Sequence, residues 1–315
     1  MPEYSDVYIL PQYSDVMTRK SVSTTSVLDP KHNGTPINVP VISANMDTVT
    51  DGYMALKIGE AGGLGAIHRF MSIQDNVEEW AKAKGMHCLV SVGVTGDARE
   101  RAEALYAAGA RNFVIDIAHG HHKLMRDMID FMKSNFDEAY VMAGNVATAD
   151  GAVELVKWGA DAVKVGIGPG AACTTKNVTG VTIPQFSAVQ EAAKAAKTED
   201  PKTVVVADGG VREIGDIAKA LGAGADFVMM GRMFASCPEA PHPGVYRGMA
   251  SLDAMKTMRL TDELPTPEGK TIALKTDKHV DEVIDLIQGG LRSAFSYSNS
   301  LTLNEFHERC KFGYR

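Results

Sequence analysis

One loop of the 315-residue chain combines a thiol, a hydroxyl and several glycines in a short stretch. It runs from Gly166 to Thr175 and reads GIGPGAACTT, with Cys173 two positions before Thr175. A cysteine thiolate is a strong nucleophile, and a nearby hydroxyl can carry a proton to or from the reacting group. A glycine-rich backbone can also turn carbonyl oxygens toward a monovalent cation. The loop therefore predicts covalent catalysis at Cys173 beside a candidate cation site.

The other cysteines have no comparable surroundings. Cys88 lies inside an apolar run, and nothing near Cys237 or Cys310 would activate a thiol. No CxxC pair occurs, so neither a disulfide framework nor a cysteine-bound metal is predicted. Reduced cysteines of this kind are typical of a cytoplasmic protein. The segment 119–122 holds three histidines without a carboxylate or cysteine at ligand spacing, which favours a cofactor contact over a metal site.

Short apolar runs rich in Val and Ile alternate with segments of helical periodicity, which predicts strands buried on both faces between amphipathic helices. The expected strands are Val39–Asn45, Gly65–Arg69, Cys88–Val94, Asn112–Ala118, Tyr140–Val146, Asp161–Ile167, Thr203–Asp208 and Asp226–Gly231. The expected helices are Gly52–Ala61, Ile73–Lys84, Ala98–Ala108, Lys123–Asn135, Ala149–Trp158, Pro184–Ala196 and Glu213–Leu221. Four helices are expected to end at a glycine: Gly62, Gly109, Gly159 and Gly222.

Eight such units predict an α/β fold, a (β/α)₈ TIM barrel. The alternative is an open doubly wound sheet, but no unit opens with G-x-G-x-x-G. One domain is expected over residues 1–315, with an N-terminal extension (1–37) and a C-terminal flap segment. Barrel enzymes place their sites after the strands' carboxyl ends and often bind phosphate after strands 7 and 8. Those loops are Asp208-Gly209-Gly210 and Gly231-Arg232. Backbone N–H groups of the glycines suit a phosphate, whereas Asp208 suits sugar hydroxyls.

The composition excludes several classes of protein. The chain has 32 basic and 39 acidic side chains, a net charge of −7, which argues against nucleic acid as the main partner. No apolar run approaches the roughly 18–20 residues that a membrane span needs. The first residues, MPEYSDVYILPQ, lack the pattern of a secretory signal.

Longer motifs then indicate a family. The run VGIGPGAACTTKNVTGVTIPQ, together with ADGG, GADFVMMG, GMASLDAM, EGK and GGLRSAFSY, resembles the inosine monophosphate dehydrogenase and guanosine monophosphate reductase superfamily. The resemblance covers nearly the whole chain, from YSDVYILPQYSD through SANMDTV and AGNVAT. Within this superfamily, two features are more similar to the reductase. They are the motif GIGPG-x-x-CTT followed by TGV and PQ, and the spacing from Met249 to Glu268.

The resemblance implies a reaction. The Cys173 thiolate would add to C2 of GMP, ammonia would leave a covalent thioimidate, and NADPH would deliver hydride to release IMP. Thr175 would relay a proton that Glu268 supplies. The dehydrogenase instead hydrolyses its intermediate with an Arg-Tyr pair on a flap. The flap-like segment Met258–Glu268 contains Arg259 but no adjacent Tyr, so hydrolysis is expected to be poor.

The resemblance also implies binding residues and partners. The substrate-binding residues would be Asp208, Gly209, Gly210, Gly231, Gly248 and Met249, with Gly269 and Lys270 contacting the base and flap. The cofactor-binding residues would be Asp116, Ile117, Ala118, Arg69, Ile167 and Gly168, with Thr18 and Arg19 on the adenine side from a neighbouring subunit. Potassium would be held by the backbone carbonyls of Gly168, Gly170 and Cys173. A homotetramer acting on a purine nucleotide is expected, without nucleic acid or membrane partners.

Departures from the family pattern leave the substrate open. Ala171 stands where the family usually has Ser, and Arg232 replaces a Gly of the reductase. We expect Arg232 to supply a charged phosphate contact instead. Pro265 and Pro267 stiffen a segment that in the reductase carries an Arg, and YRGMASLDAM is more similar to the dehydrogenase. The alternatives are a dehydrogenase without the regulatory insert, a reductase of a deoxy or modified purine nucleotide, and a non-catalytic nucleotide-binding protein.

Overall fold

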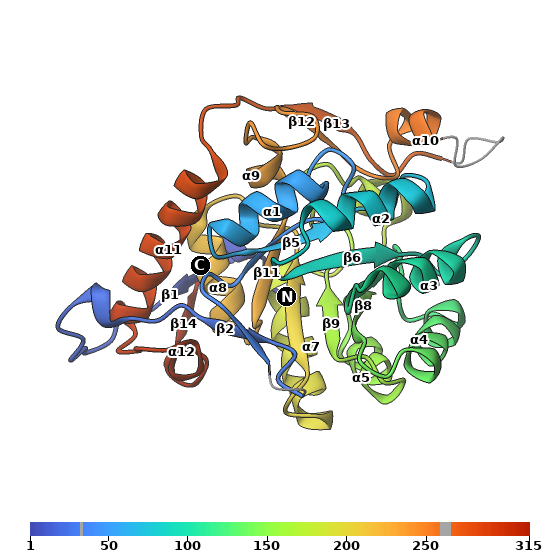
Figure 1. The fold of residues 1–315 in the computed structure, drawn as a ribbon. Coiled ribbons are helices and arrows are strands. Elements are labelled where there is room, and N and C mark those ends of the chain that lie inside the picture. Colours follow the sequence, from blue (N-terminus) through green and yellow to red (C-terminus); the bar gives the residue numbers. More distant parts are fainter. Residues whose placement is uncertain (32–33, 259–265) are drawn as a thin grey trace.

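A closed barrel of eight parallel strands forms the centre of the molecule (Figure 1). The computed structural model describes residues 1–31, 34–258 and 266–315. Strands pair in the order β10-β11-β4-β5-β6-β7-β8-β9, and β9 pairs with β10 to close the barrel. The strands are β4 (Val41–Ser43), β5 (Leu64–Ile67), β6 (Cys88–Val92), β7 (Asn112–Asp116), β8 (Tyr140–Val146), β9 (Ala162–Val165), β10 (Val204–Asp208) and β11 (Phe227–Met230). Each overlaps a predicted strand, so the (β/α)₈ barrel is confirmed.

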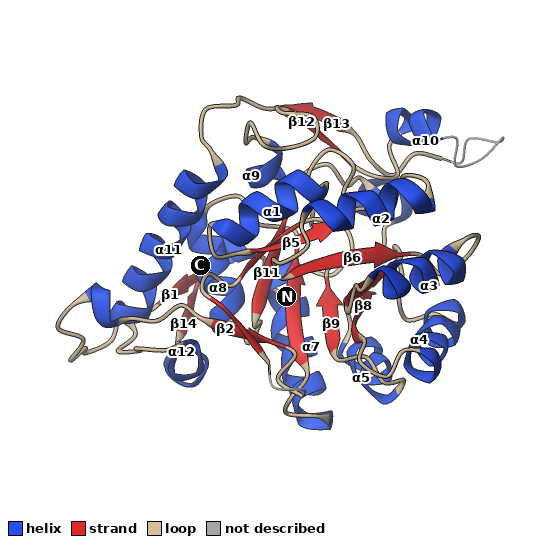
Figure 2. Cartoon of the chain, in the orientation of Figure 1, coloured by secondary structure: helices blue, strands red, loops and turns tan. Residues whose placement is uncertain are grey.

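Helices surround the strands, as Figure 2 shows. They are α1 (Gly52–Glu60), α2 (Ile73–Lys82), α3 (Ala98–Ala108), α4 (Lys123–Asn135), α5 (Ala149–Lys157), α7 (Gln185–Glu199), α8 (Ile214–Gly222) and α11 (Val280–Tyr297). The first seven confirm the predicted helices. The periodicity did not predict α11, which buries one face made of Val280, Val283, Ile284, Ile287, Leu291 and Phe295.

Local interactions explain where several helices begin and end. The side chains of Asp51, Ser72 and Thr148 accept hydrogen bonds from backbone N–H groups in the first turns of α1, α2 and α5. Such caps satisfy N–H groups that have no partner within the helix. Gly109 (φ 110°) and Gly159 (φ 102°) adopt the left-handed conformation after α3 and α5, as predicted.

The predicted helix end at Gly222 is wrong. Helix α8 continues through this residue, and the left-handed glycine is Gly224 (φ 108°). A Cβ atom at position 222 would lie 2.6 Å from Cys310 Sγ, so the glycine allows the C-terminal segment to pack closely on α8. Helix α7 also extends beyond its predicted end at Ala196, to Glu199.

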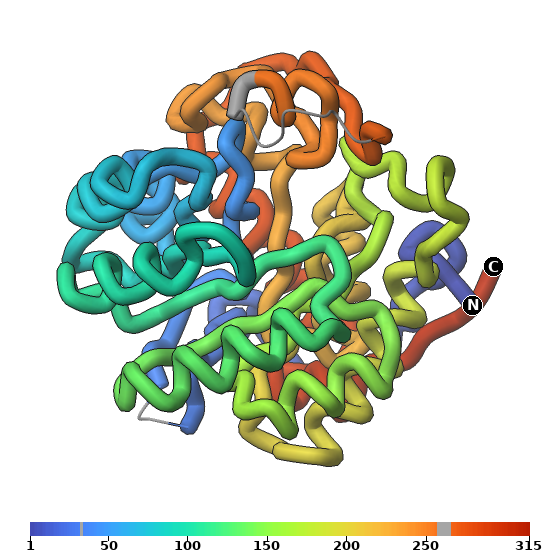
Figure 3. The backbone as a smooth tube through the Cα atoms, turned by 90° about the vertical axis from the view of Figure 1, so that its right-hand side faces the viewer, coloured from blue at the N-terminus to red at the C-terminus, as the bar shows by residue number. Residues whose placement is uncertain are grey.

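The two ends of the chain meet beside the barrel. Strand β1 (Val7–Ile9) pairs antiparallel with β14 (Phe312–Tyr314), and Figure 3 shows the termini close together. The N-terminal extension also contains the short 3₁₀ helices η1 (Tyr4–Asp6) and η2 (Arg19–Ser21) and the hairpin of β2 (Ser26–Leu28) and β3 (Thr35–Ile37). Helix α12 (Leu303–Arg309) precedes β14.

Additional elements follow β9 and β11. They are α6 (Thr175–Thr179), α9 (Arg232–Ala235), α10 (Leu252–Met258) and the antiparallel pair β12 (Val245–Arg247) and β13 (Thr271–Ala273). Figure 1 shows β12, β13 and α10 together at the top of the molecule. Most of the predicted flap, including Arg259 and Pro265, lies outside the described residues. Over the described parts of the chain, no helix is long and apolar enough to cross a membrane.

Candidate active site

A cavity with two lobes opens where the barrel strands end. Both lobes contain Cys173, Thr175, Asn145, Asp208 and Met249. The first, called here the Arg69 lobe, has a volume of about 480 Å³ and adds Asn45, Arg69, Phe70, Asp116, Ile117, Lys164 and Ile167. The second, the Tyr246 lobe, has about 240 Å³ and adds Gly170, Gly209, Gly231, Tyr246, Gly248 and Glu268. The predicted nucleophile, Cys173, therefore lies where the lobes join. Two ligands, one bound in each lobe, would meet at the Cys173 sulfur.

The cysteine loop brings the thiol and the hydroxyl into contact. Cys173 Sγ lies 3.2 Å from Thr175 Oγ1, and the Cys173 N–H donates to the Gly170 carbonyl at 3.0 Å. Thr175 begins α6, which places its hydroxyl beside the loop. At Gly166 (φ 152°) any Cβ would overlap the Asp208 carbonyl, so glycine is needed for the loops after β9 and β10 to approach each other.

Backbone hydrogen bonds join the segment around Glu268 to the cysteine loop. The Thr174 N–H donates to the Glu268 carbonyl at 2.8 Å, and the Lys270 N–H donates to the Ala172 carbonyl at 2.9 Å. The Glu268 N–H in turn donates to the Ala250 carbonyl at 3.0 Å. Three segments far apart in sequence are thereby held together, and Glu268 lines the lobe that contains Cys173 and Thr175.

Two glycines make this junction possible. A Cβ at Gly248 would lie 2.7 Å from the Ala172 carbonyl oxygen, and one at Gly269 would lie 2.9 Å from the Ser251 nitrogen. Both distances are too short for a real contact, so only glycine lets these backbones approach. Gly269 and Lys270 thus lie in the junction and do not line either lobe.

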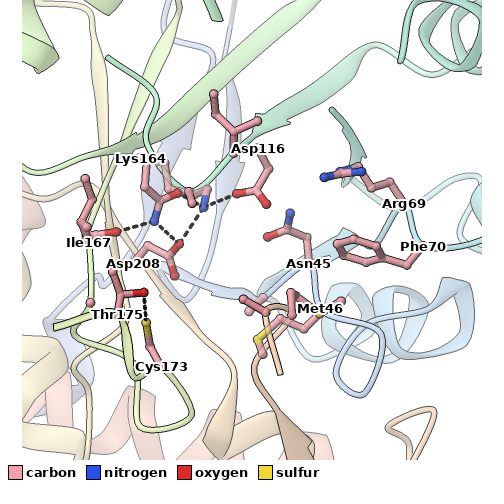
Figure 4. A pocket seen from close by; sticks show the side chains of 18 of the residues that line it. Asn45, Met46, Arg69, Phe70, Asp116, Lys164, Ile167, Cys173, Thr175 and Asp208 are labelled. Carbon is pink, nitrogen blue, oxygen red and sulfur yellow. Dashed lines mark hydrogen bonds and ion pairs between the residues drawn. The ribbon is translucent and has the colours of Figure 1, made fainter. Parts of the chain in front are cut away.

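A buried polar network forms the floor of the site (Figure 4). Lys164 Nζ lies 2.8 Å from Asp116 Oδ1 and 2.6 Å from Asp208 Oδ2, and it also contacts the Asn145 amide oxygen. The Asn145 Nδ2 group donates to Asp208 Oδ2 at 2.9 Å and to the Gly166 carbonyl at 2.7 Å. The network links β7, β8, β9 and β10, so it fixes the Asp208 carboxylate relative to the cysteine loop.

The charges of this network stabilise one another. Burial disfavours the ionised form of Asp116, but the Lys164 ammonium, together with Arg69 and a hydrogen bond from Asn45, outweighs it and holds the pKa of that carboxyl below its usual range. Burial alone would lower the pKa of Lys164, but the two carboxylates raise it above its ordinary value. Lys164 is therefore a permanently charged group that lines the Arg69 lobe.

The Arg69 lobe contains a donor without a partner. Arg69 packs over the Phe70 ring with 4.7 Å between the guanidinium carbon and the ring centroid. Its Nε group is buried and has no hydrogen-bond partner among the described residues. Burial lowers the pKa of Arg69, and the Asp116 carboxylate opposes that shift. A buried N–H facing a cavity is expected to donate to a ligand.

Most predicted site residues line one of the two lobes. The cofactor-binding candidates Asp116, Ile117, Ala118, Arg69, Ile167 and Gly168 line the Arg69 lobe. Of the substrate-binding candidates, Asp208, Gly209, Gly231, Gly248 and Met249 line the Tyr246 lobe. Gly210 does not line it, and Arg232 lines a separate cavity. Thr18 and Arg19 lie in the N-terminal extension, where Arg19 contacts the Tyr297 hydroxyl at 3.2 Å.

Four polar residues of the site were not predicted from the sequence. Asn145 and Lys164 lie inside strands predicted as apolar, and a polar side chain in such a run was the available signal. Gln185 Nε2 donates to the Val165 carbonyl at 2.8 Å and to the Asp208 carbonyl at 3.1 Å. Tyr246 packs against Gly231, where a Cβ would lie 2.6 Å from its ring. No local pattern indicated these two contacts.

The other cysteines are held in apolar surroundings, His68 and His122 make local hydrogen bonds, and His119 lines neither lobe. Burial raises the pKa of Cys88 to about 12 and has the same effect on Cys237 and Cys310. His122 accepts a hydrogen bond from the Leu124 N–H at the start of α4, and buried His68 accepts one from the Phe70 N–H. Outside the gaps at 32–33 and 259–265, no three His, Cys, Asp or Glu side chains form a metal-binding group.

Comparison with known proteins gives the class. The model of the IMP dehydrogenase / GMP reductase domain matches residues 2–315. An inosine-5'-monophosphate dehydrogenase of Aquifex aeolicus is 42% identical over 238 residues, which are 70% of this chain and 48% of that protein. GMP reductases of Shewanella halifaxensis and an Enterobacter species are 36% and 37% identical over 98% of this chain and 93% of theirs.

The chain belongs to the IMP dehydrogenase / GMP reductase family, whose named members are oxidoreductases. The match spans about half the length of the Aquifex dehydrogenase but nearly all of both reductases. Relatives of both names are similar to this chain, so the family alone does not decide between the two reactions.

Proposed function

We propose that the protein catalyses the reductive deamination of GMP to IMP, with NADPH as the reductant. The observation that carries the proposal is the 3.2 Å contact between Cys173 Sγ and Thr175 Oγ1 at the junction of the two lobes, with Glu268 lining one of them. A nucleophile and a hydroxyl relay thus lie in contact, in a lobe that the carboxyl-bearing residue Glu268 also lines. The similarity to GMP reductases over nearly their full length supports the reductase over the dehydrogenase.

Three residues of this chain act in the proposed reaction: Cys173, Thr175 and Glu268. The Cys173 sulfur forms a bond to C2 of the purine, and the bond from C2 to the exocyclic nitrogen breaks after that nitrogen is protonated. Thr175 relays this proton from Glu268, because ammonia leaves readily only when its nitrogen carries the extra proton. NADPH, when bound, supplies the hydride that C2 takes up. The bond between sulfur and C2 then breaks, and the thiolate is regenerated as IMP forms.

The Tyr246 lobe is assigned to the nucleotide. The Asp208 carboxylate, held by Lys164 and Asn145, would accept hydrogen bonds from the ribose hydroxyls. Backbone N–H groups of Gly210 and Gly231 would bind the 5′-phosphate, and Gly209, whose N–H donates to the Met229 carbonyl, would let the loop turn toward it. The base would lie against Gly248 and Met249, with Gly269 and Lys270 closing that side. Arg232 directly follows Gly231 and is our candidate for a charged contact to the 5′-phosphate.

The Arg69 lobe fits the nicotinamide cofactor. The unpartnered Nε group of Arg69 and the Asp116 carboxylate offer a donor and an acceptor to a carboxamide. The carbonyls of Gly168, Gly170 and Cys173 would hold potassium, which stiffens the loop and needs no acidic side chain. Thr18 and Arg19 would contact the adenine of NADPH bound to a neighbouring subunit. This assignment therefore requires the expected homotetramer.

The proposal also covers the domain organisation, the substrate class, other partners and the location of the protein. We propose one catalytic domain over residues 1–315, a purine nucleotide as the substrate, and no role for nucleic acid or a membrane. A cytoplasmic location suits the isolated thiols of the chain. The second candidate function is an IMP dehydrogenase without the regulatory insert, favoured by the 42% identity to the Aquifex protein. A reductase of a deoxy or modified purine nucleotide is the third.

A substrate panel tests the proposal. Purified protein is mixed with GMP, dGMP, IMP or XMP and with each oxidised or reduced nicotinamide cofactor, and the absorbance of the reduced nicotinamide is followed. GMP with NADPH should lose absorbance and release ammonia. A gain with IMP and NAD, without loss for GMP, would instead establish the dehydrogenase. Cys173→Ala should abolish turnover, whereas Cys310→Ala, at another half-buried cysteine, should retain it.

A further inference from the structure

A second cavity near the barrel mouth is lined by three basic side chains. It has a volume of about 490 Å³ and shares no lining residue with either lobe of the candidate active site. Arg212 follows β10, Arg232 begins α9, and Lys275 follows β13. Three elements that are separate in sequence therefore turn cations toward one volume, which is called here the basic cavity.

The cations of the basic cavity are not neutralised by the protein. None of the three forms an ion pair with any described residue, and no Asp or Glu lines the cavity. The neighbouring Glu213 carboxylate accepts a hydrogen bond at the start of α8 instead. The three side chains are exposed to solvent, and their clustering around one cavity of a chain with a net charge of −7 indicates a site for an anion.

The position of the basic cavity narrows the choice of anion. Arg212 stands two residues after Gly210, and Arg232 directly follows Gly231. Those glycine loops are the proposed binding site of the nucleotide 5′-phosphate. Gly209 and Gly231 line the Tyr246 lobe, whereas Val211 and Arg232 of the same two loops line the basic cavity, so an anion in the basic cavity would lie beside the loops that bind that phosphate. Phosphate groups match the planar donor fork of arginine and the compact charge of lysine.

We propose that the basic cavity binds a second phosphate group adjacent to the nucleotide 5′-phosphate. This inference rests on the proposed function for the position of the nucleotide. The group is either the β-phosphate of a nucleoside 5′-diphosphate or free inorganic phosphate, which share the same charge and oxygen acceptors. The site would thus extend nucleotide recognition beyond a monophosphate, through Arg212 and Lys275 in addition to Arg232.

Equilibrium binding to the full-length protein tests the inference. Dissociation constants for GMP and GDP are measured by calorimetry on wild type and on the double variant Arg212→Gln/Lys275→Gln. The matched control, Arg99→Gln/Lys194→Gln, removes the same charges from exposed positions elsewhere. A second arm titrates inorganic phosphate into protein saturated with GMP. Circular dichroism verifies that each variant is folded.

We expect the protein to prefer GDP over GMP, and this preference to depend on the charges of Arg212 and Lys275. GDP should bind about tenfold tighter than GMP, because each exposed cation contributes about two- to fivefold to binding a neighbouring anion. The ratio should fall toward one in the double variant and at high salt, but not in the control. If free phosphate is the ligand, only the second arm responds, with the same dependence on Arg212 and Lys275.

Equal affinity for GMP and GDP in wild type, together with no binding of inorganic phosphate, would overturn the inference. A preference for GDP that survives in the double variant would overturn it as well. Failure of the proposed function is distinguishable, because GMP with NADPH would then not turn over in the substrate panel, whereas the binding of GMP, GDP and phosphate is measured without turnover. If phosphate binding in that case still depends on Arg212 and Lys275, the proposed anion site is supported even though the proposed reaction is not.

Discussion

Replacing Lys164 by Met would leave Asp116 and Asp208 on the floor of the cavity without their shared cation. The Lys164 side chain is 2% exposed and lies 2.8 Å and 2.6 Å from the two carboxylates. Removing one partner of a buried ion pair typically costs about 3–5 kcal/mol. The carboxylates are 25% and 20% exposed to the cavity, so water reduces the penalty. We expect the lower end of this range, about 3 kcal/mol of unfolding free energy.

The pH dependence of the loss distinguishes this cause from simple loss of packing. In the wild type the folded pKa of Asp116 lies below its unfolded value, so its contribution to stability is present above the unfolded pKa and is lost as the pH falls through the folded pKa. In the variant, burial dominates and raises the folded pKa. The penalty is then largest at neutral pH and is relieved as the pH falls, by at most about 1.4 kcal/mol per pH unit for one group.

Urea unfolding followed by tryptophan fluorescence measures both effects, because the chain contains Trp80 and Trp158. The comparison is made at pH 7.5 and pH 5.5. The control is Lys197→Met, which removes a half-buried lysine paired with Asp226 at 2.8 Å outside both lobes. It should cost only about 1 kcal/mol. An equal loss for Lys164→Met at both pH values would refute the electrostatic account of the floor.

Three further changes address the site directly. Thr175→Val removes the hydroxyl beside the Cys173 sulfur and should lower kcat about 10²–10⁴-fold with little change in KM, whereas Thr175→Ser should restore turnover. Gly269→Ala places a methyl group 2.9 Å from the Ser251 nitrogen; it should displace the Glu268 segment, lowering kcat and destabilising the protein by about 1–3 kcal/mol in thermal unfolding. Arg247→Met removes the cation paired with the buried Asp47 carboxylate and should cost about 3 kcal/mol in urea, a loss that Asp47→Asn in the same chain should partly restore. Unchanged values in any of the three would contradict the contact concerned.

The barrel and the central part of the site follow from short-range patterns. Apolar runs of strand length and amphipathic segments between them predicted all eight barrel strands and seven helices, because each pattern depends on neighbouring residues. Cys173 and Thr175 are two positions apart, so a single loop already places their side chains together. Helix α11 was missed and Gly222 misassigned, since both depend on packing against distant segments.

Only the tertiary structure decided how the remaining groups meet. Glu268 reaches the cysteine loop because three backbones pack closely at Gly248 and Gly269, a contact between segments far apart in the chain. Lys164 lies in a strand whose sequence does not show which side chains face the barrel interior, so its two carboxylate partners could not be inferred. The sequence thus determined which groups follow the strands, while closure of the barrel determined which of them touch, because contacts between remote segments form only when the strands pair in one register.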